Sequence, residues 1–325
     1  MRWMMATLVL AVLAAPVAAE AQPAAKAVPR IGFLGNLDAK NQGRNVAAFQ
    51  EGLRDLGWIE GQTVMVDYRW AEGNADRLPG LVAELVQLNV NVMVVAGPPA
   101  VRAAQRATST IPIVFAVVLN DPVASGFAAS FARPGGNITG LASQYEEIVG
   151  KHVQLLSEAI PRLSRMILLR HTAGLPILLT EAEKAARRLG IKARIVEVTE
   201  VAEYEDAFRI AKGERAQAVY VLPSPIFNAH RKRLVELAAQ YHLPAAYELK
   251  EYVEAGGLLS YGPNTADMYR RAASYVDRIL KGAKPGDLPI ERAATFELAI
   301  NVKTAKALGL AIPQSLLARA DHLIE

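Results

Sequence analysis

The sequence predicts an α/β fold that consists of two lobes. Short apolar strands alternate with segments whose apolar residues recur every three or four positions, a pattern typical of parallel sheets covered by helices. The alternation runs over residues 30–118 and starts again after residue 143. With 325 residues, of which 52% are hydrophobic, the chain can bury two cores. A ligand site between the two lobes is therefore expected.

The first half is predicted to contain four strands and three helices. The strands are expected at residues 30–34, 64–70, 92–95 and 113–118. Two helices are indicated by the apolar stripes Val46, Phe49, Leu53, Leu56 and Leu78, Leu81, Leu85, Leu88. A third helix starts near Pro99, since proline is tolerated in a first helical turn, and ends near residue 107.

The second half repeats this plan. Strands are predicted at residues 166–169, 193–198, 218–222, 244–247 and 258–261. Helices are predicted between them at residues 149–160, 178–189, 204–212 and 228–241. A helix over residues 265–280 fits either half, and the tail holds a strand at residues 296–301 followed by a helix. Parallel neighbours and right-handed connections are expected.

The N-terminal segment has the layout of a secretory signal peptide. Arg2 precedes an apolar run from Met4 to Ala15, and small residues then lead to Ala21. This run is shorter than the ~20 residues that cross a bilayer. We expect residues 1–21 to be cleaved, with an uncleaved N-terminal anchor as the alternative. The signal segment leads us to expect a periplasmic protein. Because the sequence has no cysteine, we expect neither disulfide bonds nor a lipid-modified cysteine at the cleavage site.

The charge distribution does not indicate a nucleic-acid partner. The formal net charge is +4. The densest basic run, residues 230–233, lies on a predicted helix and has no interleaved aromatic residues. A solvated helix face explains this run better than a nucleic-acid site.

Patterns typical of catalysis and of cofactor binding are missing. No glycine-rich phosphate motif follows a strand, and the five histidines lack the spacing of metal ligands. We therefore expect no catalytic residue, no cofactor and no metal. The segment around Ser260 resembles a nucleophile elbow with one residue too many. An exported hydrolase or isomerase that uses His171, Glu248 and Ser260 is the alternative.

Candidate ligand-binding residues follow the carboxyl ends of the predicted strands, where open parallel sheets bind their ligands. Two facing lobes would bring these ends to one cleft. The candidates are Asn36, Gly97, Pro98, Asp121, Ser143, His171, Ser224, Tyr247, Glu248 and Tyr261.

Several of these candidates have a structural alternative. Asp121 before a proline is a common turn residue, and Ser224 before a proline suits a helix cap. The two tyrosines can be core residues with their hydroxyls at the rim. His171 can be a hydrogen-bonding loop residue. Glu248 is suited to meet a ligand ammonium group, and the alternative is an ion pair with a neighbouring arginine.

Five stretches form a specific combination that spans nearly all of the chain after residue 30. They are Gly52–Gly61, Tyr68–Gly73, Asp121–Val123, Pro134–Gly140 and Ile300–Leu310. Together they resemble the ABC-transporter substrate-binding proteins of the family that includes tryptophan- and tyrosine-binding members.

This resemblance implies a periplasmic-binding-protein fold of the first type, with two Rossmann-like lobes and three crossings. The crossings are expected near residues 139–143, 256–261 and 285–295. The first lobe would comprise residues 30–140 and about 262–284, and the second would comprise residues 141–261 and about 285–325.

The resemblance also implies a non-catalytic monomer that closes over a small solute and delivers it to a membrane permease and its ATPase. A sensor that signals to a membrane receptor is an alternative with the same cleft.

One position departs from the family pattern. Relatives commonly carry a hydroxyl residue after the glycine at the end of the third strand, whereas Gly97 is followed by Pro98 and Pro99. The two prolines remove two N–H donors. A ligand carboxylate would be left with the N–H groups of Ala100 and Val101. The expected ligand is an amino acid, with an aromatic one as an option, or a related organic acid.

Overall fold

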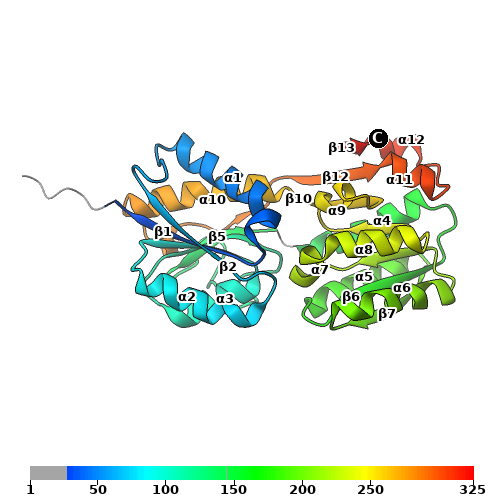
Figure 1. Ribbon diagram of the computed structural model, residues 1–325, viewed down its shortest axis with the longest axis horizontal. Helices are drawn as coiled ribbons and strands as arrows, with labels where there is room; N and C mark the ends of the chain where they lie inside the picture. Colours follow the sequence, from blue (N-terminus) through cyan, green and yellow to red (C-terminus); the bar gives the residue numbers. More distant parts are fainter. Residues whose placement is uncertain (1–27, 144) are drawn as a thin grey trace, which may run out of the picture.

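The computed structural model describes residues 28–143 and 145–325 and contains two helix-covered sheets side by side (Figure 1). The predicted two-lobe α/β class is confirmed. The expected signal peptide, residues 1–21, lies outside the described residues. Within the described part, no helix combines the length and apolar character that a membrane crossing requires.

The first sheet has the strand order β11-β5-β4-β3-β1-β2, and all neighbours are parallel. Every residue of the third strand is buried, as expected for a sheet covered on both faces. The strands are β1 (Arg30–Gly35), β2 (Met65–Trp70), β3 (Val92–Ala96), β4 (Ile113–Val118), β5 (Ile138–Ala142) and β11 (Glu291–Arg292).

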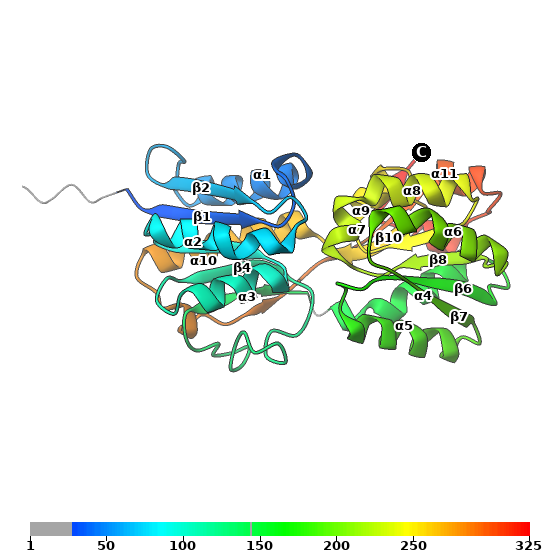
Figure 2. The ribbon, with the colours of Figure 1, turned by 60° about the horizontal axis from the view of Figure 1, so that its bottom comes forward.

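Two pairs of helices enclose the first sheet. On one face lie α1 (Ala39–Asp55) and α10 (Thr265–Leu280), and on the other lie α2 (Leu78–Gln87) and α3 (Pro98–Ala107). Phe49 and Leu53 share a core with Met268 and Ala272. The helix over residues 265–280, which the sequence pattern leaves open, therefore returns to the first lobe after most of the second has been built (Figure 2).

The second sheet has the order β13-β12-β10-β9-β8-β6-β7, in which only β10 and β12 pair antiparallel. Its short central strands are fully buried. The strands are β6 (Arg165–His171), β7 (Lys192–Val198), β8 (Ala218–Val221), β9 (Ala245–Tyr247), β10 (Leu259–Pro263), β12 (Phe296–Asn301) and β13 (His322–Ile324).

Helices also cover both faces of the second sheet. One core is formed with α4 (Val149–Ala159) and α5 (Pro176–Arg188), and the other with α6 (Tyr204–Gly213) and α8 (Arg231–Gln240). Shorter helices complete this lobe. They are α7 (Pro225–Ala229), α9 (Lys250–Glu254), α11 (Val302–Ala307) and α12 (Gln314–Leu317).

The chain passes between the two sheets in three places, and their limits differ from those expected. Residues 139–142 belong to β5, so the first connection follows them. Residues 259–263 pair with β9 and β12, which moves the second connection to Asn264. Glu291 and Arg292 pair with β5, so the third connection is residues 293–295. A hydrogen-bonded strand cannot serve as a free connection, which explains these shifts.

Residues 285–290 also lie with the first lobe, although the expected boundary placed residues 285–325 in the second. Leu288 and Ile290 are buried in the two cores of the first lobe. The Thr139 hydroxyl donates a hydrogen bond to the Leu288 carbonyl oxygen at 2.7 Å. The sequence pattern missed this because β11 has only two residues, too few for a recognisable apolar period.

Candidate functional site

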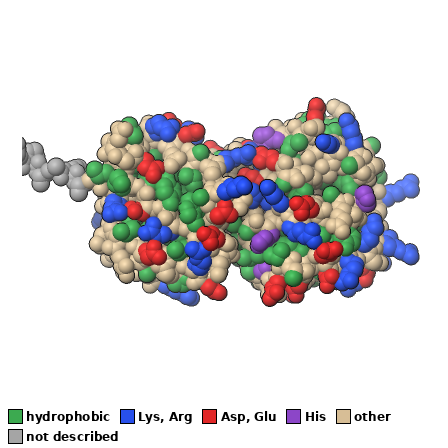
Figure 3. Space-filling view, in the orientation of Figure 1, with side chains coloured by type: hydrophobic (Ala, Val, Ile, Leu, Met, Phe, Trp, Pro, Cys, Tyr) green, Lys and Arg blue, Asp and Glu red, His purple; other side chains and the backbone are tan. Residues whose placement is uncertain are grey.

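A hollow of about 400 Å³, part of it open to solvent, lies between the two lobes. The first lobe contributes Asn36, Gly73 and Pro99 to its wall, and the second contributes Ala173, Pro225 and Ile226. Its lining among the described residues includes no Lys, Arg, Asp or Glu. On the face seen in Figure 3, acidic and basic side chains gather along the boundary between the lobes.

Asn36 and Gly97 meet at the end of β1 and β3. The Asn36 side-chain amide donates to the Ala96 carbonyl oxygen at 2.5 Å, and its backbone carbonyl accepts from the Gly73 N–H at 2.7 Å. Gly97 has φ +77°, and a Cβ there would lie 2.6 Å from the Asn36 amide nitrogen. Only glycine fits this approach. Pro98, the next residue, opens α3 and is partly exposed.

Gln42, which the sequence pattern did not single out, lies next to this corner. Its side chain is only 6% exposed. Gly35 has no side chain at the point where the Gln42 and Trp70 side chains meet it, so both pack against the backbone of β1. The helical stripe of α1 is read from its apolar residues, which is why a buried glutamine on the same helix escaped notice.

Asp121 forms the turn that its sequence context suggests. Its Oδ1 accepts hydrogen bonds from the N–H groups of Val123 at 2.7 Å and Ala124 at 3.3 Å. Its own N–H donates to Oε1 of Glu146 at 3.1 Å. Ser143 is buried nearby, and its N–H donates to the Val118 carbonyl oxygen at 2.8 Å. Contact of either residue with a ligand stays a prediction.

Glu248 follows β9 and is the most unusual polar group of the second lobe. The residue is 2% exposed, and neither carboxylate oxygen has a hydrogen-bond partner within residues 28–143 and 145–325. Burial raises the pKa of Glu248 to about 8. The Asn228 side-chain amide, which points toward the carboxylate but falls short of hydrogen-bond geometry, opposes that rise, and the Glu251 carboxylate reinforces it. The alternative of an ion pair with a neighbouring arginine is wrong for the described residues, because the carboxylate has no such partner.

Tyrosines and a histidine surround this carboxyl group. The Tyr145 hydroxyl lies 2.9 Å from Nε2 of His152, whose ring stacks on Tyr220 at a centroid distance of 4.8 Å. Burial lowers the pKa of His152 to about 4, so its imidazole is neutral at pH 7. Desolvation by burial raises the pKa values of Tyr145 and Tyr220 well above the usual range, with Glu248 adding to the rise.

The two candidate tyrosines differ in their burial. Tyr247 is fully buried, stacks on Tyr252 at 4.6 Å, and its hydroxyl has no partner in the described part of the chain. Tyr261 is partly exposed and stacks on Phe296 at 6.0 Å. Their aromatic contacts agree with the core alternative, and a direct ligand contact stays a prediction for both.

His171 and Ser224 both contact α7. The His171 ring accepts a hydrogen bond at Nδ1 from the Ala173 N–H at 3.0 Å and meets Phe227 edge-on at 5.6 Å. Burial lowers the pKa of His171. Ser224 is the N-cap of α7, with its Oγ accepting from the Ile226 N–H at 3.3 Å. His171 therefore makes the hydrogen bond, and Ser224 the helix cap, that were the structural alternatives to ligand binding. Both residues lie next to a helix that lines the hollow.

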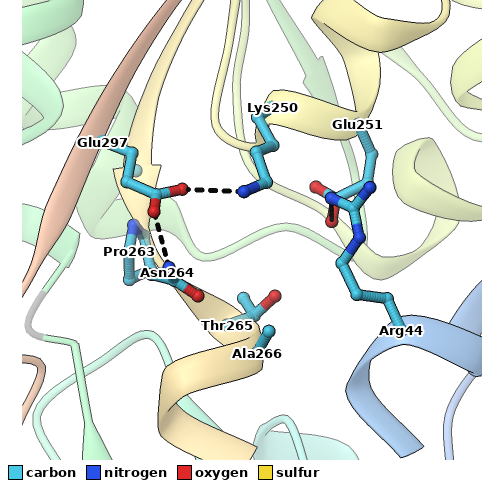
Figure 4. A pocket seen from close by; sticks show the side chains of 9 residues that line it. Arg44, Lys250, Glu251, Pro263, Asn264, Thr265, Ala266 and Glu297 are labelled. Atoms are coloured by element: carbon cyan, nitrogen blue, oxygen red, sulfur yellow. Dashed lines mark hydrogen bonds and ion pairs between the residues drawn. The ribbon is translucent and has the colours of Figure 1, made fainter. Parts of the chain in front are cut away.

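A second hollow, of about 280 Å³, lies beside the second and third connections (Figure 4). Lys250 Nζ lies 3.1 Å from Oε2 of Glu297, and the Asn264 side-chain amide donates to Oε1 of Glu297 at 2.5 Å. Arg44 reaches Glu251 from the first lobe at 3.6 Å. Because its charged side chains pair with one another, this hollow offers a ligand no unmatched charge.

The structure therefore brings Asn36, Gly97 and Pro98 together on the first lobe. It gathers His171, Ser224, Tyr247 and Glu248 at the strand ends of the second. Asp121 and Ser143 lie near the first connection, and Tyr261 lies within β10. In the described residues, no group of three or more His, Asp or Glu side chains is arranged to hold a metal ion.

Comparison with known proteins gives a consistent result. A tyrosine-binding protein of Clostridioides difficile is 23% identical over 264 residues, which are 81% of this chain and 75% of that protein. The crystal structure of a conserved domain protein of Vibrio cholerae is 27% identical, covers 91% of this chain and 99% of its own, and superposes with a TM-score of 0.83.

A domain of Streptococcus pneumoniae solved in complex with L-Trp shows the same fold. It is 23% identical, covers 91% of this chain and 99% of its own, and has a TM-score of 0.83. The family model described as ABC transporter substrate binding protein matches residues 36–324. The chain therefore belongs to the ABC transporter substrate-binding protein family.

Proposed function

We propose that this solute-binding protein of an ABC transporter closes its two lobes over one small organic molecule outside the cytoplasmic membrane. It then presents that molecule to the transporter's permease. Export through a cleaved signal peptide and action as a monomer are part of the proposal. The three connections would act as the hinge.

One observation carries the proposal. The carboxyl ends of parallel strands from both sheets face one hollow, and buried polar atoms without partners in the described residues occur at these strand ends on both lobes. Asn36 and Glu248 each hold such atoms, on opposite lobes. Buried polar groups are nearly always hydrogen-bonded, so these atoms are positions at which a solute held between the lobes would find hydrogen-bond partners.

The geometry gives less support to the hydrolase or isomerase alternative. His171 uses Nδ1 to accept from the Ala173 N–H. Within the described residues, its Nε2, the Ser260 hydroxyl and the Glu248 carboxylate have no hydrogen-bond partner. A nucleophile and its base are expected within hydrogen-bond reach of each other. We infer that the protein is not an enzyme.

The test is to identify the bound solute. The full-length gene is expressed with its own N-terminal segment, and the protein is purified natively from the periplasmic fraction. Small molecules released by denaturation are identified by mass spectrometry and added back to the refolded protein. A single solute that raises the melting temperature would support the proposal. Chemical turnover of that solute, abolished in the His171→Ala variant, would contradict it.

A further inference from the structure

Unpartnered hydrogen-bond acceptors lie at the facing strand ends, together with groups that can donate, namely His171 Nε2 and the hydroxyls of Tyr247 and Ser260. The acceptors include Asn36 Oδ1 and Gln42 Oε1 on the first lobe and both carboxylate oxygens of Glu248 on the second, none with a partner in residues 28–143 and 145–325. The residues Gln42 and Glu248 are 6% and 2% exposed. A buried acceptor without a donor is unfavourable. A ligand that relieves this must bring hydrogen-bond donors.

Glu248 lies at the middle of this edge of the second sheet. It follows β9, which lies between β8 and β10 in the sheet. The strand β8 leads to α7, whose Pro225 and Ile226 line the hollow between the lobes. On the other side, Gly262 of β10 lies so close to the Glu248 carbonyl group that a side chain would not fit. A ligand that binds at the middle of this sheet edge would therefore face the buried carboxyl group of Glu248.

The helix starts at the same edge are poor sites for an anion. Backbone N–H groups at a helix N-terminus normally attract a carboxylate. Here α3 begins with Pro98 and Pro99, α5 with Pro176 and α7 with Pro225. Proline has no N–H to donate. Three helices that follow strands facing the cleft have therefore lost donors in their first turn.

The remaining donors near β1 and β3 are largely engaged. The Val101 N–H donates to the Gly97 carbonyl oxygen at 3.1 Å, so of the two donors expected for a ligand carboxylate only that of Ala100 is left. The N-cap of α1 is Asp38, whose carboxylate accepts from the Asn41 N–H at 2.9 Å. A negative cap repels a second carboxylate.

The cations between the lobes are also engaged. Arg44 pairs with Glu254 at 3.0 Å, and Lys250 pairs with Glu297 at 3.1 Å. Arg231 donates to the Asn228 carbonyl oxygen at 3.0 Å and, across the lobes, to the Asn41 side-chain oxygen at 2.9 Å. A ligand carboxylate would have to displace one of these contacts.

We propose that the interlobe site selects an organic amine in its ammonium form, with Glu248 as the counter-ion, and makes no dedicated contact with a ligand carboxylate. This inference rests on the proposed function and narrows its ligand class. It favours amines over the organic acids that the sequence left open.

The proposal has a consequence for protons. Tyr145, Tyr220, Tyr252 and Glu251 surround the Glu248 carboxyl group, and burial holds its pKa at about 8, so it is mostly protonated at pH 7. An ammonium group beside it favours the carboxylate. The ligand arrives already as an ammonium ion, and Glu248 loses its proton to the solvent. Binding at pH 7 should therefore release up to one proton per ligand.

The experiment uses matched compounds on the natively purified protein. Each set contains an amino acid, the amine without its carboxylate and the acid without its amino group. Suitable sets are tryptophan, tryptamine and indolepropionate; tyrosine, tyramine and hydroxyphenylpropionate; and leucine, isopentylamine and methylpentanoate. Melting temperatures identify binders, and calorimetry in two buffers of different ionisation enthalpy measures the protons released.

In at least one set, the amine should bind about as well as the amino acid and release a proton, and the acid should not bind. Glu248→Gln should weaken amine binding by about tenfold or more and abolish the proton release. The matched control Glu214→Gln, at the far end of α6, should change neither, since Glu214 pairs with Arg194.

The outcomes separate the two proposals. Binding of the acids, or of amino acids but not of the amines, overturns the amine inference and leaves the solute-binding proposal standing. Binding only of an amine-free solute, for instance a neutral sugar found by mass spectrometry, does the same. If no compound and no co-purified molecule binds, both proposals fall.

Discussion

Glu248 is the residue whose ionisation depends most on its surroundings. An exposed glutamate is ionised at pH 7, but burial without a partner disfavours the charged form and raises its pKa to about 8. His152, a few side chains away, shows the same cause with the opposite sign, because burial lowers its pKa to about 4. Both groups are therefore mainly neutral at pH 7.

These two groups predict how stability depends on pH. A folded-state pKa raised from 4.5 to about 8 makes the free energy of unfolding fall as pH rises through that window. A folded-state pKa lowered from 6.5 to about 4 makes it fall as pH drops through its own window. Between pH 4.5 and 6.5 the two groups change the free energy of unfolding in opposite directions. Between pH 6.5 and 8 His152 no longer contributes, so of these two groups only Glu248 makes the free energy of unfolding depend on pH.

In the wild type, the free energy of unfolding should decline between pH 6.5 and 8, and Glu248→Gln should remove this decline. The decline should be at most about 1.4 kcal/mol per pH unit, the free energy of one pKa unit. Urea unfolding of the ligand-free protein at pH 6.5, 7.2 and 8 measures it, with Glu214→Gln as the control. Identical slopes in wild type and Glu248→Gln would show that Glu248 is ionised in the folded protein.

At the scale of elements, the packing of α1 against α10 closes the first lobe. The two helices are far apart in sequence and share one core. Gly52 is buried at their contact, where a Cβ would lie 2.6 Å from the Arg270 carbonyl oxygen and 2.9 Å from the Ala273 Cβ. Gly43 lies on the same helix with nothing within 4 Å of its would-be Cβ. The two glycines thus form a matched pair.

Gly52→Ala and Gly43→Ala should change stability in opposite directions. Alanine is favoured over glycine within a helix by about 0.5–1 kcal/mol, which Gly43→Ala should gain. Gly52→Ala must push α10 away from α1 and should lose about 1–3 kcal/mol, as overpacked cores do. Urea unfolding measures both. A gain in both variants would mean that the helices separate at no cost.

At the scale of the whole molecule, polar contacts cross between the lobes away from the connections. Arg44 of α1 reaches Glu251 and Glu254 of α9, and Arg231 of α8 donates to the Asn41 side-chain oxygen at 2.9 Å. The Arg44 side chain is 48% exposed. Exposed ion pairs contribute only about 0–1 kcal/mol, so they can bias closure of the lobes without locking it.

Arg44→Gln should increase the fraction of ligand-free molecules with separated lobes. Small-angle X-ray scattering should then give a larger radius of gyration than for wild type, and high salt should enlarge the wild type in the same way. Arg319→Gln is the control, because Arg319 pairs with Glu158 inside the second lobe at 2.7 Å. Equal radii for all three proteins would show that this ion pair does not hold the lobes together.

The fold class could be predicted from the sequence because strands and helices alternate with clear apolar periods. The predicted strands at residues 30–34, 92–95 and 113–118 correspond to β1, β3 and β4. The connections were placed less well. The two-residue β11 has no period of its own and is defined only by its pairing with β5. Register between strands depends on partners that sequence periodicity does not identify.

The candidate site stays a prediction, and the sequence supplied only part of it, for a related reason. Strand ends pointed to Asn36, Gly97 and Glu248, because the end of a buried strand is a local feature of the sequence. Gln42, Tyr145 and Asn228 were not among the candidates, since polar residues on helices are usually exposed and the sequence does not mark the exceptions. Only burial and the atoms that face them single these residues out.

The sequence by itself therefore determined the two-lobe α/β class and the family resemblance, and it predicted the edge at which we propose that a ligand binds, all of which depend on local patterns along the chain. Only the tertiary structure decided which strands each connection joins. It also decided which buried polar atoms have no partner in the described residues and that burial raises the pKa of Glu248 to about 8. Pairing, burial and desolvation depend on residues distant in sequence, and the chain specifies them only once it is folded.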